Sequence, residues 1–411
     1  MTHAWADDRA LRGSAQRFLL APGAACGELL LESKPIPVYR GEFWTARQRQ
    51  AARIHEISYR ACFKPQLPAY FIERLTEPGD IVYDPFSGRG TTTIEAALRD
   101  RQVIDNDINP LSVLLTRPRL EPPKIEAIEA RLATVPLQVE AGRIPDLSMF
   151  YHPDTLQEIA ALRHYLRRRK ASGDEDAVDR WIRMVATNRL TGHSKGFFSV
   201  YTLPPNQAAS PENQIKINSK LNQEPERRDT HAIILRKSRE LQRDLTGVQR
   251  SRLHAAAAGA RFFTVAAHRT AQIADATVQL TVTSPPFLDV VQYARDNWLR
   301  CWFNGLDAEA IGRRLTMSKT VEDWCASMRK VFAELHRVTR TGGWVAFEVG
   351  EIRKGKIRLE EHVVPLALAA GFECEAVLIN EQQFTKTANI WGVDNNRSGT
   401  NTNRIVVLRK G

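Results

Sequence analysis

Cysteine is scarce and scattered in this sequence of 411 residues. The five cysteines form no C-x-x-C pair, which argues against a disulfide framework or a zinc site and predicts a reducing, cytoplasmic environment. No run of about 18 apolar residues occurs, so we expect no membrane-spanning helix. The N-terminus carries early acids and only a short apolar patch, so we expect no secretory signal.

Positive charge is in excess, with 58 Lys and Arg against 47 Asp and Glu and a pI near 9.6. Such a balance predicts a polyanionic partner, most often nucleic acid, and a basic soluble enzyme is the alternative. Residues 154–275 hold 21 Lys and Arg against 13 Asp and Glu. Most of the net charge of +11 therefore lies in the middle third of the chain.

Hydrophobic spacing predicts an α/β protein that is interrupted by a basic helical insert. Residues 58–119 contain a strand, a glycine-rich turn, a helix and a second strand, the pattern of a parallel βαβ unit. Residues 120–275 predict helices and polar loops, and residues 276–411 return to alternating strands and helices. With residues 1–57 as an N-terminal extension, the two α/β segments form one core around the insert.

A glycine-rich turn runs from Asp84 to Thr92, where an apolar strand ends and a helix begins. Gly88 and Gly90 allow the backbone to approach a ligand closely, and free N–H groups at the helix start suit a carboxylate or phosphate. The lysine of a P-loop is missing, and the spacing is not G-x-G-x-x-G. Asp84 at the strand end suits a ligand with an ammonium group; the alternative is a purely structural turn.

Two acids, Asp105 and Asp107, end the next strand about 20 residues after the first glycine. An α/β nucleotide site places its ribose-binding carboxylate at this point. Both acids are candidates for that role, and a solvated turn is the alternative.

A second turn, Thr283-Ser284-Pro285-Pro286-Phe287, follows another apolar strand. Proline has no N–H and stiffens the loop, so nearby carbonyls can accept protons from a ligand. A hydroxyl, rigid carbonyls and an aromatic ring suit a planar base that carries an exocyclic amine. The alternative is a tight turn with a buried phenylalanine.

Together, the D-P-F-x-G-x-G-T-T and S-P-P-F motifs resemble those of the S-adenosylmethionine-dependent DNA amino-methyltransferases. The segments Phe63–Pro68, Val290–Asn297 and Thr341–Gly350 are similar to further family motifs. The insert lies between the two main motifs, where one branch of the family carries its target-recognition region. The stretch Val265–Arg269 departs from the family pattern, so no adenine-ring contact is assigned there.

The resemblance implies a Rossmann-like fold with a mostly parallel seven-stranded sheet, S-adenosylmethionine as cofactor and no metal. It implies that Asp84 binds the methionine ammonium, that Asp107 binds the ribose and that the S-P-P-F loop grips a flipped base. The implied cofactor-binding residues are Lys64, Pro65, Asp84, Pro85, Phe86, Ser87, Gly88, Gly90, Thr91, Thr92, Asp107 and Ile108. The implied catalytic residues are Ser284, Pro285, Pro286 and Phe287.

The leading interpretation is a DNA cytosine-N4 methyltransferase, because serine at the first catalytic position leans toward cytosine in this family. Adenine-N6 methylation of DNA is the main alternative; an RNA base methyltransferase and a DNA-binding module on a dead methyltransferase fold are the others. The expected partner is double-stranded DNA in a bacterial or archaeal cytoplasm, with the protein near the nucleoid. The oligomer (monomer or homodimer) and the presence of a separate cognate restriction endonuclease stay open.

We predict that the insert at 120–275 recognises DNA. Its arginine run would contact phosphates, and polar side chains in 188–220 would read base edges, because Asn, Gln and Arg bind bases bidentately. A solvated helix face and an ordered loop are the alternatives. The candidate DNA-binding residues are Arg167, Arg168, Arg169, Arg189, Lys195, Asn206, Gln207 and Lys216.

Overall fold

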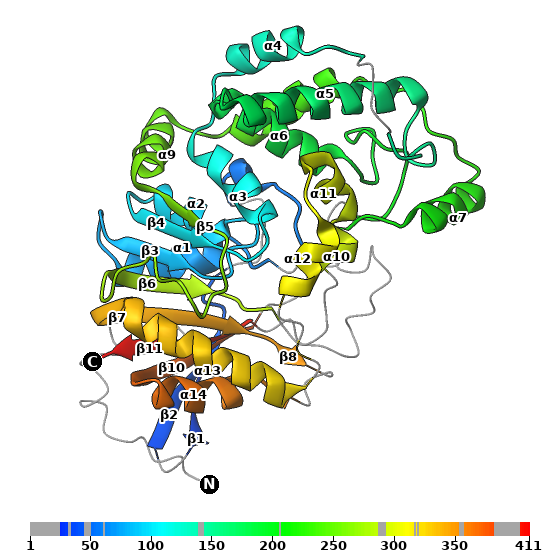
Figure 1. The fold of residues 1–411 in the computed structure, drawn as a ribbon. Coiled ribbons are helices and arrows are strands. Elements are labelled where there is room, and N and C mark those ends of the chain that lie inside the picture. Colours follow the sequence, from blue (N-terminus) through cyan, green and yellow to red (C-terminus); the bar gives the residue numbers. More distant parts are fainter. Residues whose placement is uncertain are drawn as a thin grey trace.

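The computed structural model describes residues 25–31, 34–44, 51–60, 62–138, 144–204, 207–286, 293–315, 318, 320–352, 357–381 and 403–411. These residues form a large sheet with helices on both faces and, beside it, a group of helices in the middle of the chain (Figure 1). The α/β prediction is confirmed.

The main sheet has nine strands in the order β1-β2-β10-β11-β7-β6-β3-β4-β5. The strands are β1 (Ala25–Leu31), β2 (Lys34–Gly41), β3 (Ile81–Asp84), β4 (Gln102–Asn106), β5 (Arg261–Phe263), β6 (Val278–Thr283), β7 (Thr339–Val349), β10 (Phe372–Asn380) and β11 (Asn403–Lys410). A separate pair comprises β8 (Glu351–Ile352) and β9 (Ile357–Arg358).

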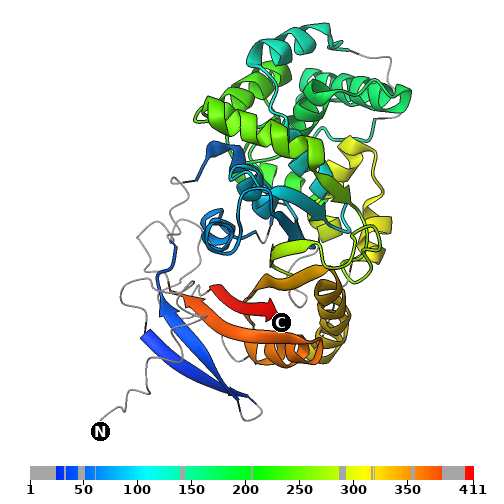
Figure 2. The ribbon, with the colours of Figure 1, turned by 90° about the vertical axis from the view of Figure 1, so that its left-hand side faces the viewer.

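The predicted number of seven strands is wrong, because the hairpin β1–β2 extends the sheet next to β10 (Figure 2). Pro35 and Pro37 lie within β2. Proline is depleted in strands because it cannot donate to the ladder, so the sequence of this strand gives little strand signal.

Five parallel strands, β5, β4, β3, β6 and β7, form the centre of the sheet. From β3 the chain proceeds outward to β4 and β5 on one side, whereas β6 and β7 lie on the other. The direction of winding thus reverses between β3 and β6, which is where doubly wound sheets bind ligands, beyond the carboxyl ends of the strands. Both predicted motifs, after Asp84 and after Thr283, lie at this edge.

Alternate residues of the central strands enter different hydrophobic cores on the two faces of the sheet. Val82 packs with α1 (Gln66–Leu75) and α2 (Thr91–Ala97), whereas Tyr83 packs with α13 (Val321–Val338) and α14 (Glu360–Ala369). Because both faces are covered, β6 is buried along its whole length, as its run of Val, Leu and Thr suggests.

The helical region follows two short elements and comprises six helices. The elements from β4 to the end of this region are α3 (Leu111–Thr116), η4 (Arg117–Leu120), α4 (Ile125–Thr134), α5 (Pro153–Ser172), α6 (Ala177–Arg189), α7 (Pro211–Leu221), α8 (Thr230–Gln242) and α9 (Gly247–Gly259). Trp181 and Ile234 of this region join the same core as Val82, so the insert packs on the sheet rather than around a core of its own.

The helical region ends earlier than the predicted boundary at residue 275. Strand β5 (Arg261–Phe263) already belongs to the sheet, paired with β4. A strand of three residues is too short for periodicity to reveal, so the sequence could not place this boundary.

Three short helices connect the S-P-P-F side of the sheet to the helical region: α10 (Tyr293–Asp296), α11 (Trp298–Asn304) and α12 (Ala308–Arg314). The Trp298 indole Nε1 donates to the carbonyl of Ala209, and Arg163 Nε on α5 donates to the carbonyl of Trp302. Among the described residues, no helix is both long and apolar enough to span a membrane.

Candidate active site

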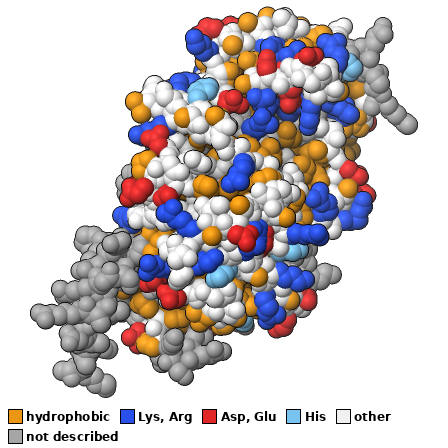
Figure 3. Space-filling view, turned by 60° about the vertical axis from the view of Figure 1, so that its left-hand side comes forward, with side chains coloured by type: hydrophobic (Ala, Val, Ile, Leu, Met, Phe, Trp, Pro, Cys, Tyr) orange, Lys and Arg blue, Asp and Glu red, His pale blue; other side chains and the backbone are white. Residues whose placement is uncertain are grey.

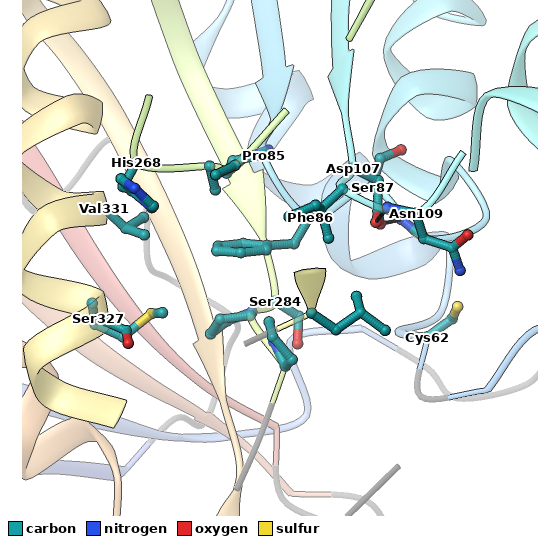
Figure 4. Close-up of a pocket in the computed structure, with 18 of the residues that line it drawn as sticks. Cys62, Pro85, Phe86, Ser87, Asp107, Asn109, His268, Ser284, Ser327 and Val331 are labelled. Carbon is teal, nitrogen blue, oxygen red and sulfur yellow. Dashed lines mark hydrogen bonds between the residues drawn. The ribbon is translucent and has the colours of Figure 1, made fainter. Parts of the chain in front are cut away.

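A cavity of about 180 Å³ opens at the carboxyl ends of β3, β4 and β6. Figure 4 shows Asp107 and Asn109 on one side of it, His268 and Val331 on the other, and Phe86 and Ser284 between them. Its lining comes from residues 59, 62–63, 85–88, 91, 107–109, 266–268, 284–286, 315, 327–328 and 330–331. The structure therefore brings together two motifs that lie about 200 residues apart in the sequence.

The glycine-rich turn has the backbone conformation that its composition predicts. Gly88 and Gly90 adopt positive φ angles of 55° and 72°. A Cβ atom on Gly90 would collide with the side chain of Thr116, and one on Gly88 would lie 3.4 Å from the Tyr59 ring. Gly90 is thus needed for close packing, whereas at Gly88 it is the positive φ, rather than space, that favours glycine.

Asp84 is buried directly beneath this turn. Its Oδ1 accepts hydrogen bonds from the Thr283 hydroxyl at 2.6 Å and from the Phe86 N–H at 3.1 Å. Its Oδ2 is buried and accepts no hydrogen bond in the described structure, although the Thr92 hydroxyl, which donates to Val282, lies nearby. Burial raises the pKa of Asp84 to about 7. A buried carboxylate oxygen without a donor fits a ligand that brings a cationic N–H group.

The two acids that competed for the ribose role lie in different environments. Asp105 is fully buried, and its Oδ2 accepts from the Ser87 and Thr93 hydroxyls. Asp107 lines the cavity and accepts from the N–H groups of Gly88 and Asn109, each at 2.8 Å. Burial raises the pKa of both acids to about 6. The structure therefore leaves Asp107 as the candidate ligand contact and gives Asp105 a role in holding the turn.

The S-P-P-F loop is fixed at both of its described ends. The Thr92 hydroxyl donates to the carbonyl of Val282, before the loop, at 3.0 Å, and the Trp324 indole Nε1 donates to the carbonyl of Pro286 at 3.0 Å. Ser284, Pro285 and Pro286 line the cavity. The predicted aromatic contact, Phe287, lies outside the described residues.

A buried glutamate next to Ser284 is a site residue that the sequence motifs did not predict. Glu348, at the end of β7, accepts hydrogen bonds from the Ser284 hydroxyl and from the Asn403 amide on β11. Burial raises the pKa of Glu348 to about 7. In the sequence Glu348 is only part of the later strand motif, because nothing local indicates that three strands converge there.

Several other cavity residues also carry no signal in the sequence. Tyr59 and Cys62 come from the segment before α1, and His268 comes from the turn after β5. The Asn109 amide donates to the Tyr59 hydroxyl at 3.0 Å, which ties this wall to the end of β4. The stretch that departs from the family pattern therefore still contributes a wall of the cavity, through residues 266–268.

The remaining predicted cofactor residues lie around the cavity rather than in its lining, with one exception. Lys64 is half-buried, and burial together with the nearby Arg89 lowers its pKa. Pro65 precedes α1 and lines a different depression. Gly90 packs against Thr116 and Thr92 donates to the carbonyl of Val282, both outside the lining, whereas Ile108 lines the cavity.

Two predicted DNA-contact arginines have partners within the protein. Arg169 donates through Nε to Asp179 Oδ2 at 2.6 Å. Arg189 is 8% exposed, and its guanidinium carbon lies 4.0 Å from the centre of the Phe197 ring. Both side chains stabilise the helical region in this structure, which their positions in the sequence could not reveal.

The other predicted DNA contacts are more accessible. Arg167, Arg168, Lys195 and Lys216 are exposed. Gln207 is partly buried and accepts from Arg60 at 3.4 Å, and Asn206 lies outside the described residues.

Comparison with known proteins supports the assignment of the first motif. Residues 16–115 match a family model described as DNA methylase, of the N6/N4 methyltransferase type. The predicted resemblance to DNA amino-methyltransferases is confirmed over this segment.

Two curated relatives match similar lengths of chain. The Type II methyltransferase M.MjaII of Methanocaldococcus jannaschii is 32% identical over 85 residues, which cover 20% of this chain and 16% of the relative. The Type II methyltransferase M.XycI of Xanthomonas campestris pv. cyanopsidis is 34% identical over 82 residues, which cover 20% of this chain and 26% of the relative. The matched segments thus span about a quarter or less of either relative.

Solved structures with matching chains include methyltransferases. A SAM-dependent methyltransferase of Methanosarcina mazei is 9% identical, with 83% of this chain and 96% of that chain covered and a TM-score of 0.30. An rRNA methyltransferase of Streptomyces viridochromogenes is 12% identical, with 89% and 91% covered and a TM-score of 0.33.

Proposed function

We propose that this protein transfers a methyl group from S-adenosylmethionine to the exocyclic amine of a base in double-stranded DNA, with cytosine N4 as the favoured target. One observation carries the proposal. Asp84, whose second carboxylate oxygen lacks a donor, is hydrogen-bonded to Thr283, the residue before Ser284. The carboxylate that would meet the cationic cofactor and the loop that would hold the base are thus joined at the carboxyl ends of β3 and β6, where the cavity opens.

Residues in and beside the cavity would hold the cofactor in a defined way. Asp84 Oδ2 would accept from the methionine ammonium, the 86–92 turn would hold the carboxylate, and Asp107 would accept from the ribose hydroxyls. Ile108 and Phe86 would flank the adenosine. When bound, S-adenosylmethionine supplies a methyl group that its sulfonium already activates.

The catalytic loop would prepare the amine, whose lone pair is delocalised into the base. The Ser284 hydroxyl oxygen and the Pro285 carbonyl would accept hydrogen bonds from its two N–H groups, so the nitrogen could pyramidalise and present its lone pair. Fixed acceptors of this kind act mainly through positioning and electrostatics. The base must first leave the duplex stack, at a cost of a few kcal/mol.

Glu348 would complete the proton path. Its hydrogen bond from Ser284 allows the serine to take a proton from the methylated nitrogen while its own proton passes to Glu348. A carboxylate with a pKa of about 7 can receive that proton near neutral pH. Asn403, which also donates to Glu348, would hold the carboxylate toward Ser284.

Helix α7 supports DNA recognition by the helical region. It stands apart from the other helices at one side of the molecule (Figure 1). Asn213, Lys216 and Lys220 are exposed and follow the three- and four-residue spacing that places side chains on one helix face. The buried Gln214 donates to the Tyr201 carbonyl at 2.9 Å, which fixes the rotation of this face. We propose that α7 contacts DNA, with Arg167 and Arg168 on α5 as phosphate contacts.

Net charge alone does not locate this surface. Acidic side chains are interspersed among Lys and Arg on the face that Figure 3 draws. Many of the arginines of the helical region are ion-paired, as Arg131 is with Asp176 and Asp179. Only the exposed cations outside such pairs can contribute to phosphate binding.

The names of the curated relatives bear on the biological setting. Both are called Type II methyltransferases, so we propose a role in restriction–modification in a bacterial or archaeal cytoplasm, with a separate endonuclease as partner. Adenine N6 is the alternative target, because the cavity could hold either base through its amine.

Methylation of plasmid DNA tests the proposal. Purified protein, plasmid and isotope-labelled S-adenosylmethionine are incubated, and the digested nucleosides are identified by mass spectrometry. Labelled N4-methylcytosine is the expected product, and labelled N6-methyladenine would transfer the proposal to the alternative target. Label in added RNA but not in DNA, or cofactor binding without transfer to either, would overturn it.

A further inference from the structure

Three segments from distant parts of the sequence meet at Asp296, the last residue of α10. Its carboxylate Oδ2 lies 2.6 Å from Arg60 Nη1, and its backbone carbonyl accepts from the N–H of Ala208 at 2.9 Å. Arg60 belongs to the segment that supplies Tyr59 and Cys62 to the cavity, and Ala208 lies just before α7. Asp296 itself lies ten residues after Pro286 of the catalytic loop.

Further hydrogen bonds hold the same junction together. Arg60 Nη1 also donates to Gln207 Oε1 at 3.4 Å. The Ser58 N–H donates to Asn188 Oδ1 on α6 at 2.7 Å, and the Ser58 carbonyl accepts from Arg300 on α11 at 2.9 Å. The cavity wall, the base of α7 and the helices after the catalytic loop are therefore joined through polar contacts over a few residues.

We propose that Arg60 is a positioning residue that holds the recognition segment before α7 in register with the catalytic loop. This inference rests on the proposed DNA methyltransferase function. The ion pair fixes Asp296, and through its backbone carbonyl fixes Ala208, so a base that is delivered by a duplex bound at α7 reaches Ser284 in line with the methyl donor. Displacement of a reacting group by about 1 Å can lower a rate by roughly 10²-fold, so this ion pair can matter without touching either substrate.

The Arg60–Asp296 pair is less exposed to solvent than a typical surface ion pair. The side chain of Asp296 is 12% exposed and that of Arg60 is 35% exposed. A sheltered pair is more sensitive to truncation of one partner than an exposed pair is, because the other charge remains buried. Arg60 is thus the natural residue to change, and Lys at this position keeps the positive charge but replaces the planar guanidinium with a single ammonium nitrogen.

The experiment compares Arg60→Ala, Arg60→Lys and Asp296→Asn with Arg252→Ala as an exposed ion-pair control. Arg252 Nε on α9 forms an ion pair of similar length, 2.7 Å, with Asp100, and both of these side chains are 41% exposed. For each variant, thermal stability, cofactor affinity by calorimetry and kcat at saturating DNA and cofactor are measured. A fluorescent base analogue, placed at the target site once the methylated sequence has been mapped, reports base flipping.

Arg60→Ala and Asp296→Asn should lower kcat by about 10- to 100-fold and reduce the flipping signal, with cofactor affinity within about twofold of wild type. Arg60→Lys should recover part of the activity, and Arg252→Ala should retain wild-type kcat. Wild-type kcat and flipping in Arg60→Ala, or an equal decrease of kcat in Arg252→Ala, would overturn the inference. Should Arg60→Ala fail to fold, the Arg60→Lys and Asp296→Asn variants test the inference, and wild-type kcat in both of them would overturn it.

Absence of methyl transfer to DNA by the wild type would instead overturn the proposed function.

Discussion

Buried charge is handled in opposite ways at the edge of the sheet and in the helical region. At the sheet edge, acids such as Asp84 and Glu348 are buried without a cation in contact, and burial raises their pKa values to about 7. In the helical region, Asp179 is equally buried but accepts from Arg131 and Arg169. Ionisation without a partner is costly in a protein interior, so the presence of buried acids with raised pKa values at the sheet edge points to a site for ligands.

The same comparison separates the two groups of sequence-based candidates. At the sheet edge, Ser87, Asp107 and Ser284 of the motifs line a cavity. In the helical region, two of the arginines that were predicted to contact DNA bind within the protein instead. Arg169 donates to Asp179, and the Arg189 guanidinium lies over the Phe197 ring. A basic residue in a helix therefore predicts a DNA contact only after its intramolecular partners are known.

Removing the charge of Asp84 should have the largest effect. Asp84→Asn should abolish cofactor binding in calorimetry, a decrease in affinity of at least about 100-fold, because the variant cannot form the buried charge-assisted hydrogen bond to the ammonium. The same variant should be more stable than wild type at pH 8. The folded-state pKa of about 7 lies above the ordinary value of 3.8, so the folded chain retains a proton that the unfolded chain releases between these pH values.

The free energy of unfolding of the wild type should consequently fall as pH rises from about 4 to about 7. Asp84→Asn should remove part of this dependence of stability on pH. Thermal melts across this range provide the measurement. Wild-type cofactor affinity in Asp84→Asn would refute the role of this carboxylate.

Ser284→Ala should separate catalysis from cofactor binding. We expect kcat to fall by roughly 10²- to 10³-fold, because the variant lacks one preorganised hydrogen bond to the reacting amine. Cofactor affinity should change less than about threefold, since Asp84 keeps its hydrogen bond from Thr283. Single-turnover methylation and calorimetry measure the two quantities, and a parallel decrease in both would mean that the loop only supports the cavity.

Glu348→Gln should produce an intermediate decrease in activity and a changed pH profile. If its carboxylate receives the proton, kcat of the wild type at saturating cofactor should rise with pH up to about 7 and then level off. The variant should be roughly 10²-fold slower at the plateau and show no such rise. Saturating cofactor removes the contribution of Asp84, which affects cofactor affinity rather than kcat. An unchanged profile in the variant would exclude Glu348 from the proton path.

The smallest effect should come from the exposed lysines of α7. Lys216→Ala with Lys220→Ala should weaken DNA binding several-fold and lower the salt slope by about 0.9 for each phosphate that the variant no longer neutralises. Arg169→Ala should instead lower the melting temperature and leave the salt slope unchanged, because its guanidinium already binds Asp179. Equal salt slopes in the lysine variant and the wild type would place DNA recognition elsewhere.

Short-range patterns account for what could be predicted. The turn from Asp84 to Thr92 and the loop at Ser284 depend on residue types within a few positions, so their composition indicated both location and chemistry. The hairpin of β1 and β2 was missed because its prolines weaken the strand pattern, and β5 was missed because three residues carry no period.

The sequence by itself determined that the chain forms an α/β core with a glycine-rich turn, a proline-stiffened loop and a basic insert, because these depend on local backbone preferences and on hydrophobic spacing. Tertiary structure alone decided that Asp107 rather than Asp105 faces the cavity, that Glu348 and Asn403 stand beside Ser284, and that Arg60 meets Asp296. Such pairings join strands and helices that are distant along the chain. They follow from the order of the strands in the sheet, which no local pattern of side chains encodes.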